Sequence, residues 1–270
     1  MRAFDHGAID EPWAANARVF GLAVTDGWLY HGVVDSGEDP TLPGELFGYV
    51  YRSREDGSQI QRVVEFSLDY GRRSLPWRPW SDDLKKGVVI GQPMLVDIEF
   101  TDAGAMIIGM RDRAVDMMLQ SHYYEHRPQG DVLLALPVGD IWQVVTARNS
   151  RYEDDTEEYN DASQGMLTHS YERDAVVTSA IGIDGSVPPR RVWLGSGVMW
   201  LDNITRRQFA HEELAVCWVC HPPPAVPRSR RPSRRLSSSS RCCDWPTIRP
   251  RRATASPWSV STIRRGSNGY

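Results

Sequence analysis

Three carboxylates near the middle of the chain have the types and spacing of a metal site. Asp97 and Glu99 alternate within an apolar run, so in a strand both side chains point to the same face of the sheet. Asp112 ends the next apolar run. Ca²⁺ takes clustered carboxylates, and the pattern predicts a calcium site. The alternative is that Asp97 and Asp112 pair with Arg111 and Arg113 and order the strand edges.

Two tryptophans are the best candidates for ligand contacts. Trp77 and Trp80 lie in the proline-rich segment SLPWRPWSDD. Aromatic rings beside a polar groove stack on sugars or peptides, so we predict that these two bind a ligand, with aromatic plugs between sheets as the alternative. Trp28 and Trp142 lie inside apolar runs and are expected in the core.

The remaining chemical motifs do not predict an enzyme. The chain contains no H-E-x-x-H zinc motif, no G-x-S-x-G nucleophile turn, no P-loop and no dinucleotide glycine fingerprint. An acidic segment lacks the central glycine and the D-x-D-x-D start of a twelve-residue calcium loop. We interpret that segment as a solvated loop. Its carboxylates are Asp154, Asp155, Glu157, Glu158 and Asp161.

Short β-hairpins are the elements that would position these residues. The clearest signal is Asp26-Gly27 between two alternating apolar runs in residues 18–34, because both turn residues accept positive φ. Helical character is limited to residues 112–120, and residues 147–174 show no period. Further strand pairs are expected at 48–54 with 61–68, 94–100 with 105–110, 131–136 with 141–146, and 175–183 with 191–201.

Hairpins at regular spacing without intervening helices indicate an all-β sandwich, barrel or propeller. We predict a partial β-propeller-like array of hairpins with a disordered C-terminal tail, and a sandwich is the second choice. The expected organisation is an irregular lead-in at 1–17, the β domain at 18–205 and the tail at 206–270.

The tail differs from the rest of the chain in charge and composition. Residues 211–270 hold eleven arginines and three acids, a net charge of +8, so the total of −4 leaves −12 for residues 1–210. All four cysteines also lie beyond residue 211. A Pro-, Arg- and Ser-rich segment without a period cannot bury enough apolar surface to offset its ordering entropy.

Three interpretations of this tail compete. We favour a shifted reading frame in a GC-rich gene, beginning between residues 205 and 220. A basic arm for nucleic acid or anionic lipid usually contains lysine as well as arginine, and the only lysines are Lys85 and Lys86. A zinc site at Cys217-x-x-Cys220 would need Cys242 and Cys243, and adjacent cysteines are poorly placed to clamp one tetrahedral ion.

Several segments carry a resemblance to a known family: FGLAVTDGWLYHGVV, LFGYVYR, QPMLVDIEFTDAGAMIIGMRDR, GDVLLA and GSGVMWLDN. Over residues 18–205 the chain resembles the N-terminal regions of large secreted bacterial surface proteins that continue into serine-aspartate-repeat or Cna-type B domains. The block Gln92–Arg113 is the most specific part. The resemblance implies a propeller-like region, export to the cell surface and no enzymatic activity. It also implies blades before Arg18 and further β repeats, so the chain is expected to be a fragment.

We therefore expect a non-enzymatic, extracellular or cell-surface β-scaffold in adhesion or structure. Its partner would be an extracellular protein or glycan, and not nucleic acid. The competing hypothesis is a calcium-dependent propeller hydrolase of the lactonase type, in which Asp97, Glu99, Asp112 and Asn203 converge on one ion. No apolar stretch is long enough to span a bilayer, and the first thirty residues do not resemble a signal peptide. Export is thus expected of a full-length parent.

Overall fold

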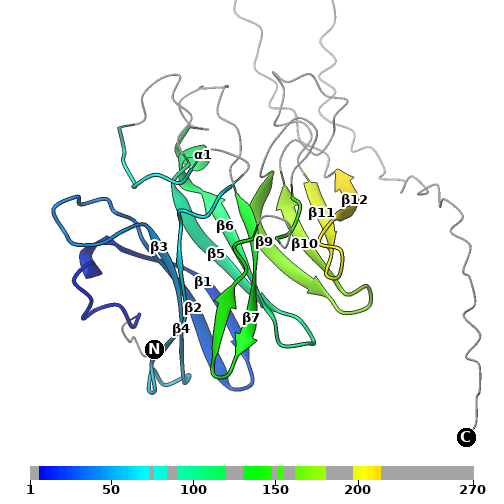
Figure 1. Ribbon diagram of the computed structural model, residues 1–270, viewed down its shortest axis with the longest axis horizontal. Coiled ribbons are helices and arrows are strands. Elements are labelled where there is room, and N and C mark those ends of the chain that lie inside the picture. The colour runs from blue at the N-terminus through cyan, green and yellow to red at the C-terminus, as the bar shows by residue number, and fades with distance from the viewer. Residues whose placement is uncertain are drawn as a thin grey trace, which may run out of the picture. The chain divides into compact units, whose positions relative to one another are not determined.

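The computed structural model describes residues 6–72, 76–83, 91–118, 130–147, 151–154, 162–180 and 197–213. These residues form three four-stranded antiparallel sheets (Figure 1). In each sheet, strands that follow one another in the chain lie side by side, so each sheet is a simple meander. No helix in this described part of the chain is long and apolar enough to cross a membrane.

Sheet 1 contains four strands after a 3₁₀ turn, η1, at Ala14–Asn16. They are β1 (Ala17–Thr25), β2 (Trp28–Asp35), β3 (Phe47–Ser53) and β4 (Gln61–Ser67). Sheet 2 also contains four strands, and a short helix, α1 (Arg113–Met118), follows the second of them. Its strands are β5 (Pro93–Phe100), β6 (Met106–Asp112), β7 (Asp131–Val138) and β8 (Ile141–Val144). Sheet 3 comprises β9 (Ser163–Ser170), β10 (Ala175–Ala180), β11 (Gly197–Asp202) and β12 (Gln208–Glu213).

The first hairpin forms where its turn residues predict it. Asp26 and Gly27 have φ of 51° and 70°, and they join Thr25 to its partner Trp28. Two successive positive φ values give the turn whose twist matches that of antiparallel strands. The local turn chemistry therefore fixes the β1–β2 register.

Sheet 2 lies between the other two sheets and buries both of its faces. Along β6, Met106 and Ile108 join the apolar cluster shared with sheet 1, whereas Ile107 joins the cluster shared with sheet 3. This alternation follows from the two-residue period of a strand. It also explains why β6 is apolar at successive positions instead of alternating with polar residues.

The far side of sheet 1 is covered by the N-terminal lead-in. Trp13, just before η1, stacks on Tyr49 of β3 with ring centroids 4.7 Å apart. Ala8 and Val33 belong to the same buried cluster. The lead-in predicted as irregular thus contributes to a small second core.

The all-β prediction is confirmed, and the propeller-like arrangement stays a prediction. Each of the expected strand pairs is present within the described residues, with α1 inside the stretch expected to be helical. Two strands differ from the expectation. Strand β9 lies in the segment where we expected an irregular loop, and β12 lies beyond the boundary placed at residue 205. The tail after Glu213 lies outside the described residues.

Candidate functional site

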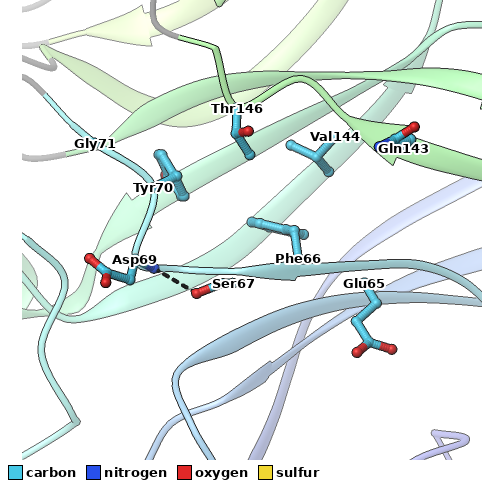
Figure 2. Close-up of a pocket in the computed structure, with 9 residues that line it drawn as sticks. All are labelled: Glu65, Phe66, Ser67, Asp69, Tyr70, Gly71, Gln143, Val144 and Thr146. Atoms are coloured by element: carbon cyan, nitrogen blue, oxygen red, sulfur yellow. Dashed lines mark hydrogen bonds between the residues drawn. The ribbon is translucent and has the colours of Figure 1, made fainter.

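A groove of about 490 Å³ lies between strand β4 of sheet 1 and strand β8 of sheet 2. Phe66 and Val144 point towards one another at its base and are buried members of the core shared by sheets 1 and 2, while the side chain of Glu65 points away (Figure 2). The segment that follows β4 closes one end. The lining residues are Glu65, Phe66, Ser67, Asp69, Tyr70, Gly71, Gln143, Val144 and Thr146.

The β4 side of the groove is a strand edge. Strand β4 pairs with β3 alone, and the amide of Leu68 donates to the carbonyl of Leu46 at 2.9 Å. Hydrogen-bonded and non-bonded pairs alternate along an antiparallel ladder. Phe66 is therefore bonded to Gly48, whereas the backbone groups of the residues beside Phe66 face away from β3. Those residues, Glu65 and Ser67, line the groove.

The β8 side has the same character. The amide of Val145 donates to the carbonyl of Leu134 at 2.8 Å, so the next pair, Val144 with Ala135, is a non-bonded one. Pro137, which has no N–H, also occupies a non-bonded position, opposite Trp142. The backbone of Val144 consequently faces away from β7.

A buried charge cluster lies behind the groove floor. Asp131 of β7 has Arg72 and Arg151 on either side, at 3.7 Å and 3.8 Å from its Oδ2 atom. Burial raises the pKa of Asp131, and the two guanidinium groups act in the opposite direction. Arg151 also donates to the carbonyl of Gly71 at 2.6 Å. This contact anchors the chain that closes the groove.

The carboxylates predicted as calcium ligands lie elsewhere, at the junction of sheets 2 and 3. Asp97 accepts a hydrogen bond from the amide of Leu167 at 2.7 Å, which joins β5 to β9. Burial raises the pKa of Asp97, although backbone donors lower it. Burial and the nearby Asp97 also raise the pKa of Glu99. The two carboxylates do share a sheet face, as the spacing predicts.

Asp112 has a different role from the other two carboxylates. Its Oδ1 atom accepts from the amides of Gln92 and Ala114, both at 2.9 Å. The second bond caps the N-terminus of α1. Asp112 faces Pro93 across the ladder, several residues along β5 from Asp97. Among the described residues, no group of three or more His, Cys, Asp or Glu side chains is placed to hold a metal ion.

A histidine that the sequence did not single out lies in the same junction. His169 of β9 has a side chain only 1 % exposed, and its Nε2 atom is 3.0 Å from the amide nitrogen of Asn203. That amide also donates to Asp174 at 2.7 Å. The Nδ1 atom of His169 has no hydrogen-bond partner among the described residues. The hydroxyl of Tyr152 completes the network by donating to Asn203 at 2.7 Å.

Both tryptophans predicted to bind a ligand are buried, with exposed fractions of 4 % for Trp77 and 7 % for Trp80. The Trp77 indole donates to the hydroxyl of Tyr70 at 3.1 Å, and the Trp80 indole donates to the carbonyl of Pro93 at 2.8 Å. Arg72 also covers the Trp77 ring at 3.6 Å. Neither ring presents an open face, so the plug between sheets is the arrangement found.

The acidic segment is described only in part. Asp154 is buried, which differs from the solvated loop expected there, and its carbonyl accepts the amide of Ala162 at 3.1 Å. The other four carboxylates of that segment lie outside the described residues. The same is true of the four cysteines considered for zinc.

Sequence reasoning missed the groove because it lies where edge strands of two different sheets come together. No residue type indicates which backbone groups face a free strand edge, because the register of the hydrogen-bonded ladder determines it. Pro137 is the one usable signal, since a proline inside a strand indicates an edge or a non-bonded position.

Comparison with protein-family models finds no match to this chain, and no curated protein matches its sequence.

Proposed function

We propose that this protein is a non-enzymatic scaffold module of a bacterial cell surface that binds an extracellular partner in the groove between β4 and β8. The observation that carries the proposal is the make-up of the groove walls. They combine strand-edge backbone, two aromatic side chains and uncharged polar groups of Ser67, Gln143 and Thr146. Such surfaces recognise a partner by hydrogen bonds and packing. The resemblance to secreted surface proteins supports the same assignment.

The competing calcium-dependent hydrolase has less support. It needs Asp97 and Asp112 to direct carboxylate oxygens at one ion, yet Asp97 bonds to a β9 amide and Asp112 caps α1. Asn203 is engaged with Tyr152 and Asp174. These contacts give the three side chains roles in joining elements, and no contact among the described residues favours hydrolysis.

The test is a binding screen with the purified full chain on an array of extracellular-matrix proteins and glycans. Thr146 is exposed and points into the groove (Figure 2), so Thr146→Arg fills the site without entering the core. Thr168 is an exposed threonine on β9, and Thr168→Arg is the matched control. We expect the wild type and T168R to retain at least one array component, and T146R to lose it.

Two results would contradict the proposal. One is that the array retains no component with the wild-type chain. The other is that T146R and T168R bind alike, which would place the binding surface away from the groove. Thermal unfolding of both variants shows whether either substitution disturbs the fold.

A further inference from the structure

A second candidate site lies on sheet 1 and shares no residue with the groove. It is formed by Trp28, the first residue of β2, and by two arginines at the end of β3, Arg52 and Arg54. We propose that these two arginines bind the carboxylate of an acidic sugar. The site therefore extends the binding capacity of the module beyond the function proposed above.

The register of the strands brings the three side chains together. Tyr30 of β2 pairs with Arg52 of β3, and side chains alternate between the two faces of a strand. Trp28 and Arg54 are each two residues away from that pair, so they lie on the same face as Arg52. The Cζ atoms of Arg52 and Arg54 are 4.4 Å and 3.6 Å from the centre of the Trp28 ring. Contact with one indole holds the two positive charges close to each other.

Neutral acceptors orient both guanidinium groups. The Nε atom of Arg52 donates to the side-chain oxygen of Gln61 at 3.1 Å, and that of Arg54 donates to Gln59 at 3.3 Å. The Nη1 atom of Arg54 also donates to the carbonyl of Gly27 at 3.1 Å. Within the described part of the chain, neither arginine forms an ion pair with a carboxylate. Both charges are thus fixed in place and still have Nη donors to offer a ligand.

Acidic residues in the adjoining turns limit the charge that the site can hold. Asp26, Glu55 and Asp56 are close to the two arginines in the sequence. Hydrogen bonds from the side chain and amide of Ser58 lower the pKa of Asp56, so its carboxylate is charged and bonded within its own turn. Residues 1–210 also carry a net charge of −12, which repels a long polyanion. A ligand with a single negative charge fits best.

The donors around the site select a carboxylate on a sugar. The planar fork of a guanidinium group matches the two oxygens of a carboxylate. The Oε1 atoms of Gln59 and Gln61 accept from the arginines, which leaves the NH₂ groups of both amides to donate to hydroxyl oxygens. Both glutamines are exposed. A sugar acid supplies one carboxylate with hydroxyl groups beside it, and this combination matches the donors present.

The test compares two ligands that differ only at the charged group. Methyl glucuronoside carries a carboxylate where methyl glucoside carries a hydroxymethyl group. Binding of each to the purified full chain is measured by isothermal titration calorimetry. We expect a Kd of about 1 mM for the glucuronoside and binding at least about tenfold weaker for the glucoside.

Variants of the arginines locate the binding site. Arg52→Gln and Arg54→Gln each remove one guanidinium group, and each should weaken glucuronoside binding about tenfold. Arg54→Lys keeps the charge but loses the fork, so it should also bind more weakly than wild type. Arg207→Gln is the matched control, because Arg207 is an exposed arginine of sheet 3. The comparison of the two glycosides uses the wild type alone and remains decisive if a variant does not fold.

Four results would overturn this proposal. The glucuronoside does not bind at about 10 mM, or the two glycosides bind equally. R207Q and R54Q lose the same affinity, which would indicate a response to overall charge. N-acetylglycine binds as tightly as the glucuronoside, which would show recognition of a carboxylate without the sugar. Thr146→Arg should bind the glucuronoside like wild type, so this site and the groove can fail independently.

Discussion

The two junctions between sheets are built in different ways. Sheets 1 and 2 share a core of large apolar side chains, with Leu95 of β5 inserted against Gly32 of sheet 1. Their backbones approach at one point, where a Cβ atom on Gly21 of β1 would lie 3.1 Å from the carbonyl oxygen of Leu95. Sheets 2 and 3 approach through their backbones, where a Cβ atom on Gly109 would lie 1.8 Å from the carbonyl oxygen of Gly165. The backbone approach is therefore closer at the second junction than at the first.

The second junction adds a polar seam to its close backbone contact. Asp97 joins β5 to the amide of Leu167, and Arg111 of β6 lies 3.4 Å from the carbonyl of Gln164. Such directional bonds fix the relative position of two strands more tightly than apolar contacts do. The second junction therefore suits rigid positioning of sheets 2 and 3.

The largest effect is expected at the close backbone contact. Gly109→Ala should lower the free energy of unfolding by about 4 kcal/mol, because the added methyl group meets backbone that cannot rotate away. Urea unfolding measures the loss. Gly71→Ala is the matched control, since nothing lies within 4 Å of a Cβ there. Equal stability of the two variants would mean that sheets 2 and 3 are free to move apart.

The junction of sheets 1 and 2 should lose stability when a cavity forms in its apolar core. Leu95 is fully buried, and Leu95→Ala should cost about 3 kcal/mol in the free energy of unfolding. The exposed Val24 of β1 provides the control, because Val24→Ala creates no cavity. Groove binding should weaken in L95A but not in V24A, as the spacing of sheets 1 and 2 changes. An unaltered stability of L95A would contradict the packing described.

Replacing Asp112 distinguishes its role as the cap of α1 from the predicted role as a calcium ligand. Asp112→Ala leaves the buried amides of Gln92 and Ala114 without this acceptor, and should cost about 2 kcal/mol. The loss should be the same with calcium present or chelated, as measured by thermal unfolding. A calcium-dependent stabilisation of the wild type that D112A lacks would restore the metal site.

The smallest effect is a change in pH profile at the polar seam. The folded state raises the pKa of Glu99 above its ordinary value of 4.5, so its contribution to stability is present below pH 4.5 and is lost as pH rises through the folded-state value. Glu99→Gln does not titrate. Its stability relative to wild type, from urea unfolding, should therefore increase between pH 4 and pH 7. A constant difference would contradict the raised pKa.

The hairpins were predictable because their signals are local. Alternating apolar residues and the Asp26-Gly27 turn specify β1 and β2 without reference to the rest of the chain. Strand β9 was missed for the opposite reason. Its sequence, SQGMLTHS, has small and polar residues, and its burial depends on Gly165 fitting against Gly109 of a distant strand. A contact of that kind leaves no mark in the local pattern.

The candidate site residues show the same division. The shared face of Asp97 and Glu99 follows from strand periodicity, but their partners come from β9, far along the chain. The capping role of Asp112 was readable, because an Asp directly before a helix is a favoured N-cap. The burial of Trp77 and Trp80 was not, because their loop is rich in proline and shows no strand or helix period that would mark a buried face.

The meander topology has a consequence for the order in which the molecule forms during synthesis. Each sheet pairs only strands that leave the ribosome one after another, so a sheet can form from neighbouring strands before the next is made. The face of sheet 2 that carries Met106 can pack against sheet 1 as soon as sheet 2 forms, because sheet 1 has already been made. Its Ile107 face waits until β9 to β11 have been translated. During that interval the nascent chain leaves Ile107, Val132 and Leu134 uncovered, a surface on which chaperones would act.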